Sequence, residues 1–188
     1  MGRILMCLIG VLCSSVAFGQ GKNNSLEGVP FKERIVFGGG LGGLSFGSYQ
    51  DFISVSPLIG YRVTAKLIAG TGFTYRYTNY KEFSPSIKLN AYGINPFLRF
   101  TVYKNIFIQT EYEYLTYEYP DTRTTTSRRD FNSVLVGGGF AQPIGEKASL
   151  YIMALYNLSY KNPSVGNYSP YDSPLVIRAG ITIGNLGF

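Results

Sequence analysis

Alternation of apolar and polar residues is the feature that most constrains the fold of this chain. Within 52–62, Ile53, Val55 and Ile59 fall on one face of an extended strand, and Ser54 and Ser56 fall on the other. Successive side chains of a β-strand point to opposite faces, so a period of two predicts strands. No stretch approaches about 18 consecutive apolar residues or sustains a helical spacing, so spanning helices are not expected.

The alternation recurs in eight segments, at 34–46, 52–62, 66–78, 87–102, 106–119, 131–142, 148–160 and 174–186. Three connections are tight, at 63–65, 103–105 and 143–147, and three are longer and polar, at 79–86, 120–130 and 161–173. The first connection, 47–51, is short. Tight turns at one end and longer loops at the other are typical of outer-membrane barrels, whose strands need about 9–11 residues to cross. The chain is therefore predicted to be all-β, an eight-stranded antiparallel up-and-down transmembrane β-barrel.

The polar face of these segments argues against a soluble sandwich or a lipocalin-like barrel. Those folds turn their polar face to water and would fill it with Lys, Glu, Asp and Gln. Here that face is mostly Gly, Ser and Thr, and charged residues make up only 15% of the chain. Small residues suit the crowded interior of an eight-stranded barrel. Aromatic residues near the strand ends predict two interface belts, one of Tyr75, Tyr77, Tyr112, Tyr114, Tyr156 and Tyr160 and one of Tyr61, Phe100 and Tyr103.

The N-terminal 19 residues are predicted to be a secretory signal peptide. A basic residue, Arg3, precedes an apolar run too short to span a bilayer, and a small-x-small site follows. Cleavage is expected between Gly19 and Gln20, leaving a leader over 20–32 and a barrel domain over 33–188. The alternative is a lipoprotein anchor at Cys7 or Cys13, which is less favoured because no small residue directly precedes either cysteine.

Composition removes most enzyme classes. The chain has no His, and its two Cys lie within the expected signal peptide, so histidine catalysis, His-ligated metals and disulfides are excluded from the mature chain. The run 38–43 matches G-x-G-x-x-G, but no helix is expected after it, so close strand packing is the better interpretation and no cofactor is predicted. The basic excess is modest and dispersed, and it predicts no nucleic-acid interface.

Motifs along 33–188 resemble the small outer-membrane barrels of the OmpX and OmpA-transmembrane-domain type, and most closely those abundant in Bacteroidetes. The motifs are the glycine-rich segment 37–42, the first tight turn with its flanks at 54–64, the turn 103–105 together with the alternating Glu-Tyr segment 111–114, and the segment 137–145, which runs from a second glycine-rich stretch to Pro-Ile-Gly. The resemblance implies a Gram-negative outer-membrane location and a C-terminal aromatic, Phe188, that the barrel-assembly machinery reads. Phe188 is out of phase with the outward positions Ile177 to Ile183, so 184–187 must bend or slip register.

Alternation also places a set of charged residues on the inner face: Arg62, Arg76, Arg99 and Arg178, together with Gln109, Glu111 and Glu113. An unpaired charge in a narrow interior is very costly. These residues are therefore predicted to form a structural network of salt bridges that fills the lumen. A polar path for a small solute is the alternative, and acid/base catalysis by the two glutamates is disfavoured because no cleft is evident.

Two of the longer loops are candidate binding surfaces. Arg123, Arg128 and Arg129 are predicted at a basic loop tip, where arginine side chains could bind lipopolysaccharide phosphates or acidic glycans. Tyr168 and Tyr171 mark a second loop, 161–173, which is a candidate adhesive surface. The predicted function is a non-enzymatic outer-membrane barrel with a structural or adhesive role. A narrow pore for solutes or ions and a subunit of a larger envelope complex remain open.

Overall fold

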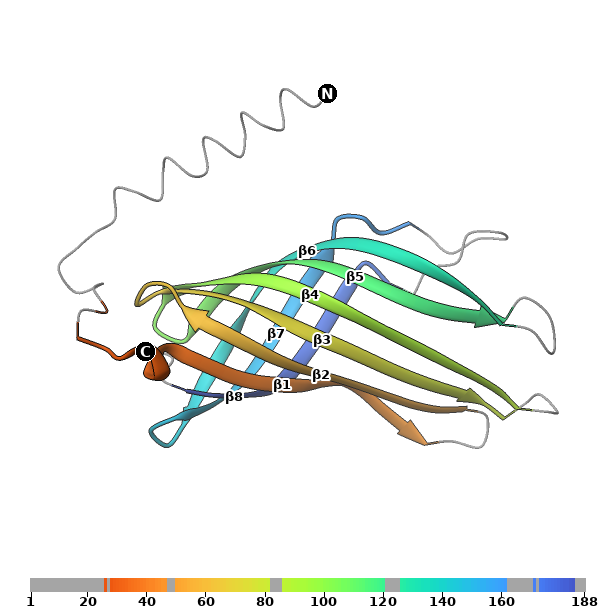
Figure 1. The fold of residues 1–188 in the computed structure, drawn as a ribbon, viewed down its shortest axis with the longest axis horizontal. Helices are drawn as coiled ribbons and strands as arrows, with labels where there is room; N and C mark the ends of the chain where they lie inside the picture. Colours follow the sequence, from red (N-terminus) through yellow and green to blue (C-terminus); the bar gives the residue numbers. More distant parts are fainter. Residues whose placement is uncertain are drawn as a thin grey trace, which may run out of the picture.

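Eight antiparallel strands close into a single barrel in which every strand pairs with its neighbours in sequence, and β1 pairs with β8 (Figure 1). The computed structural model describes residues 26, 28–46, 50–81, 86–120, 126–161, 171 and 173–184. The strands are β1 (Ile35–Phe46), β2 (Gln50–Arg62), β3 (Leu67–Tyr80), β4 (Ile87–Tyr103), β5 (Ile106–Pro120), β6 (Thr126–Ile144), β7 (Ala148–Asn157) and β8 (Leu175–Ile183). The predicted eight-stranded up-and-down barrel is confirmed.

The seam between β1 and β8 depends on glycine. The two strands pair only from Phe37 opposite Ile183 to Leu41 opposite Ala179. A Cβ on Gly40 would lie 2.5 Å from the carbonyl oxygen of Ala179, and one on Gly180 would lie 2.2 Å from that of Gly39. The glycine-rich run at 38–43 is therefore part of a strand, where it allows two backbones to approach closely.

The strands present an apolar outer face and a mixed inner face. Ile108 and Ile152 on the outer face are 54% and 56% exposed, whereas Phe107 and Leu155 on the inner face are 1% and 0% exposed. The sequence predicted an interior of small residues and charges. The interior also holds two apolar clusters, one of Phe107, Leu135, Ala141, Tyr151, Met153 and Leu155 and one of Val36, Ile68 and Phe97. Large apolar side chains therefore fill part of the lumen.

The largest differences from the predicted strand boundaries lie in the last three strands. β6 begins at Thr126, five residues earlier than expected, because its polar first residues pair with β5 beyond the apolar band. β7 ends at Asn157, so Tyr160 lies past the strand. β8 is described to Ile183. Residues 1–25, Arg123, Tyr168 and Phe188 lie outside the described residues, so the predictions that concern them are not addressed.

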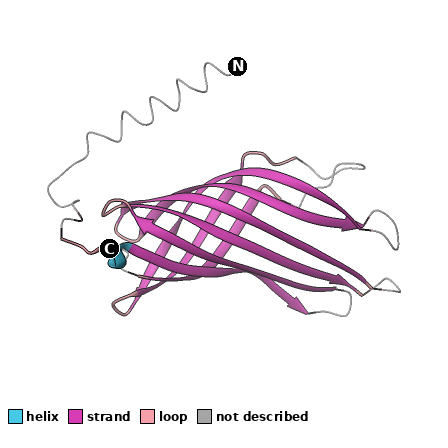
Figure 2. Ribbon diagram, viewed as in Figure 1, coloured by secondary structure: helices cyan, strands magenta, loops and turns pink. Residues whose placement is uncertain are grey.

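The three tight turns lie at one end of the barrel, with the start of β1 (Figure 1). Each turn also accepts a backbone hydrogen bond from the strand that follows its hairpin or from the residue after that strand. Thr101 N on β4 donates to Lys66 O at 2.8 Å, Ala141 N on β6 donates to Asn105 O at 2.8 Å, and Gly184 N, directly after β8, donates to Lys147 O at 2.7 Å. The described helical structure is a 3₁₀ turn at Phe31–Arg34 (Figure 2). Within the described part of the chain, no helix has the length and hydropathy to cross a bilayer.

Candidate functional site

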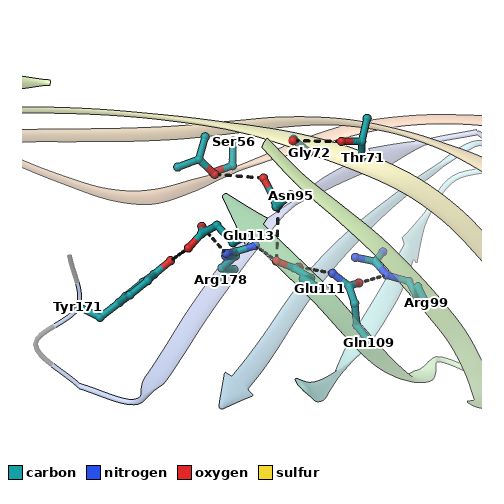
Figure 3. Close-up of polar contacts among 11 residues, drawn as sticks. Ser56, Thr71, Gly72, Asn95, Arg99, Gln109, Glu111, Glu113, Tyr171 and Arg178 are labelled. Atoms are coloured by element: carbon teal, nitrogen blue, oxygen red, sulfur yellow. Dashed lines mark hydrogen bonds and ion pairs between the residues drawn. The ribbon is translucent and has the colours of Figure 1, made fainter. Parts of the chain in front are cut away.

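A buried ion-pair cluster occupies the middle of the lumen (Figure 3). Glu111 and Glu113 lie two residues apart on β5 and therefore share the inward face, where they are 2% and 1% exposed. Arg178 reaches them from β8: its Nη1 lies 2.5 Å from Glu111 Oε2, and its Nη2 lies 3.5 Å from Glu113 Oε1. One guanidinium thus bridges two carboxylates, which neutralises part of a charge pair that would otherwise repel in a medium of low dielectric constant.

Hydrogen bonds extend this cluster across the lumen to β2. Asn95 Nδ2 on β4 donates to Glu111 Oε2 at 3.5 Å, and Thr74 Oγ1 on β3 donates to Asn95 Oδ1 at 3.3 Å. The hydroxyl groups of Thr74 and Ser56 lie 3.4 Å apart. Polar side chains of β2, β3, β4, β5 and β8 therefore form one connected network, so side chains cross the interior where an open channel would pass.

Arg99 lies between this cluster and the tight-turn end, where it contacts the amide of Gln109 and three aromatic rings. Its Nε donates to Gln109 Oε1 at 2.6 Å, and Gln109 Nε2 in turn donates to Glu111. The Arg99 guanidinium carbon lies 4.3, 5.1 and 5.8 Å from the ring centroids of Phe107, Tyr151 and Phe97. Ring faces attract cations, so they stabilise a guanidinium that has few acceptors around it.

Tyr171 closes the network on the long-loop side. Although it comes from the connection between β7 and β8, it is only 8% exposed, and its hydroxyl donates to Glu113 Oε2. The Arg76 guanidinium lies 4.8 Å from the centre of its ring. Burial raises the pKa of Tyr171 to about 12, which keeps the phenol protonated as a donor. Tyr171 is therefore not available to the predicted adhesive surface, because its side chain is buried against Glu113, and the rest of that loop lies mostly outside the described residues.

The structure brings together five of the six charged residues predicted for the lumen. Arg99, Glu111, Glu113 and Arg178 join through direct bonds or through Gln109, and Arg76 joins through Tyr171. The sixth, Arg62, is buried at the tight-turn end near Arg34. Arg34 itself donates to the carbonyl oxygens of Val29 and Leu26 at 3.0 and 2.8 Å.

The prediction that Arg128 and Arg129 lie at a loop tip is wrong, because both residues are on β6. Arg128 faces outward, and its Nε and Nη2 donate to Glu118 Oε1 at 2.9 and 2.6 Å while its Nη1 donates to Tyr92 at 2.9 Å. Arg129 stacks on Tyr119 with 5.2 Å between its guanidinium carbon and the ring centre. Cross-strand pairing thus extends the ordered ladder into the segment that was expected to be a loop.

Phe97, Phe107 and Tyr151 are lumen residues that were not predicted from the sequence. Strand parity was a usable signal, because Phe107 has the same phase as Gln109 and Glu111, and Phe97 the same phase as Arg99. No comparable signal identifies Tyr171, because a loop has no fixed period. Among the described residues, no three His, Cys, Asp or Glu side chains gather as metal ligands.

The site and the fold together define a closed antiparallel barrel that is apolar outside and filled by a polar network and apolar clusters inside. No family model matches the chain, and no curated protein matches it. A solved structure that is similar is the N-terminal β-barrel domain of Pseudomonas aeruginosa OprF, at 11% sequence identity and a TM-score of 0.47. The similarity covers 80% of this chain and 97% of that domain.

Proposed function

We propose that this chain is a non-enzymatic integral outer-membrane barrel protein whose lumen is closed and whose role is structural or surface-binding through the long-loop end. The observation that carries the proposal is the exposure of large apolar side chains on all eight strands, around a polar network that is buried inside. A soluble barrel would bury its large apolar side chains and expose its polar ones. An apolar exterior of this extent requires lipid or detergent around it.

Tyrosine hydrogen bonds support a membrane boundary at the long-loop end. Tyr75 donates to Asn90 and Tyr112 donates to Asn132, each at 3.0 Å, on the outer face. Thr116 donates to Asp130 at 2.8 Å on the same face. Aromatic rings with polar tips favour the interface between acyl chains and headgroups. On β6 the outward positions from Val134 to Ile144 are apolar apart from Gly138 and Gln142, and the length of this stretch matches the about 9–11 residues of a spanning strand.

The filled lumen favours a structural or surface-binding role over a pore. The network from Ser56 to Arg178 crosses the interior, and the two apolar clusters occupy more of it. Interaction with lipopolysaccharide, recognition of Phe188 by the barrel-assembly machinery, and association with another envelope protein are parts of this proposal. Arg128 supports a lipopolysaccharide contact less than a free arginine would, because Glu118 neutralises it.

Insertion tests the membrane part of the proposal. The purified mature chain should fold into lipid vesicles and migrate faster on an unheated gel than on a boiled one, and its strands should resist added protease. A chain that folds equally well in buffer without lipid or detergent would contradict the proposal. Affinity capture from intact envelopes, with a barrel shortened in its long loops as the control, tests the surface-binding role.

A further inference from the structure

The tight-turn end of the barrel carries a positive charge that the lumen network does not use. Among the described residues, the acids at this end are Glu33 and Glu146. The basic residues there are Lys32, Arg34, Arg62, Lys66, Lys104 and Lys147. The excess of basic over acidic side chains is therefore four, against a formal charge of +6 for the whole chain.

Three of these residues, Lys66, Lys104 and Lys147, occupy one tight turn each, and we call them the turn lysines. All three are exposed, and none forms an ion pair with a described residue. At the opposite end, Lys81 pairs with Asp51 at 2.8 Å and Arg128 pairs with Glu118 at 2.6 Å. Two basic side chains of the long-loop end are therefore neutralised by described partners, whereas Lys88 and Lys161 at that end, like the turn lysines, form no ion pair with a described residue.

The backbone holds the turn lysines at a defined height. Lys66 and Lys147 accept hydrogen bonds from the next strand through their own carbonyl oxygens, at 2.8 and 2.7 Å. Lys104 follows Tyr103, which is 62% exposed, and its Nζ lies 5.3 Å from the centre of that ring. Exposed aromatic rings at the end of a spanning strand lie at the level of lipid headgroups. The ammonium group of Lys104 is therefore expected at that level, and Lys66 and Lys147 lie in the other tight turns of the same end.

We infer that the turn lysines bind the anionic headgroups of phospholipids in the leaflet that faces the tight turns. The inference rests on the proposed function, since it requires a barrel that spans a bilayer. Unpaired ammonium groups and lipid phosphates have complementary charge, and the attraction acts within a Debye length of the surface. With anionic lipid in that leaflet, each lysine is expected to lower the unfolding equilibrium constant about fivefold, which corresponds to a stabilisation of about 1 kcal/mol.

The test uses vesicles of phosphatidylcholine that contain phosphatidylglycerol in only one leaflet, with barrel orientation read from protease protection. The urea unfolding equilibrium of the full mature chain is measured with the anionic lipid on the tight-turn side and then on the long-loop side. The variant Lys66→Gln/Lys104→Gln is compared with Lys88→Gln/Lys161→Gln, a matched control of two exposed lysines from the long-loop end. Salt at about 1 M, where the Debye length is about 3 Å, serves as a second control.

The wild type and the control variant should be more stable with phosphatidylglycerol on the tight-turn side, by about fivefold per turn lysine, and Lys66→Gln/Lys104→Gln should lose most of that difference. High salt should abolish it. A wild-type barrel that folds into both vesicles with equal stability would overturn the inference alone. Failure to insert into either vesicle would overturn the proposed function, and the inference with it.

Discussion

Glu111 connects side chains from three strands of the lumen network. It accepts from Arg178 on β8, from Asn95 on β4 and from Gln109 on its own strand. Arg178 also lies near Glu113, so the positive charge is shared between two carboxylates. Loss of one carboxylate therefore alters the pairing of every group in the cluster.

Replacing Glu111 with Gln should destabilise the barrel by about 3–5 kcal/mol, because it leaves the buried Arg178 charge with one weaker partner. Lys88→Gln is the control, because it removes one charge from an exposed side chain on the outer face. Urea midpoints of the two variants in the same detergent measure the difference. Equal midpoints for Glu111→Gln and the wild type would contradict the structural role of the network.

Tyr171 gives the network a dependence on alkaline pH. Because burial raises the pKa of Tyr171 to about 12 from about 10 in an unfolded chain, protonation favours the folded state. The stabilisation that Tyr171 provides is therefore complete below about pH 10 and is lost as the pH rises toward about 12. Unfolding free energies of wild type and Tyr171→Phe should converge over that window. A difference that is constant from pH 8 to pH 12 would show that the phenol proton is not involved.

At the scale of the strand, alternation separates outward-facing from lumen-facing residues. On β7, Ile152 faces outward at 56% exposure, and its neighbours Tyr151 and Met153 face inward at 5% and 3%. On β6, Ile144 also faces outward, at 48% exposure, but lies beside a tight turn. These two isoleucines therefore differ mainly in expected depth within the bilayer.

An arginine at Ile152 should cost about 2–4 kcal/mol, and the same change at Ile144 about 0–1 kcal/mol, because the cost of a charge on the lipid face falls toward the interface. Unfolding of the two variants in phosphatidylcholine vesicles measures the difference. Equal costs at the two positions would contradict the assignment of the outer face to lipid.

Strand parity explains how much of this fold and site the sequence could predict. The alternation in β2 and β5 is enough to place Ser54, Arg62, Glu111 and Glu113 on the inner face. It could not predict that Arg178 would pair with Glu111, because the height of a residue in the barrel depends on the register and stagger of paired strands. Nor could it place Arg128 on a strand. The first residues of β6 are polar on both faces, so they lack the alternation of apolar and polar residues that indicates a strand.

For the whole molecule, the expected processing defines the chain that reaches the membrane. Cleavage between Gly19 and Gln20 would remove both cysteines. Intact-mass analysis of protein extracted from membranes should give a chain that begins at Gln20. A lipid-modified Cys13 would contradict this prediction and support an anchored lipoprotein.

A closed lumen within an inserted barrel is the central claim, and the conductance of single barrels tests it most directly. The measurement uses planar bilayers fused with vesicles in which protease protection has already shown insertion, so that silence cannot reflect a chain that stayed outside. The network around Glu111 and the apolar clusters predict no steady conductance above that of the bare bilayer. Long-lived, reproducible channels from the wild-type barrel would contradict the account and establish the pore.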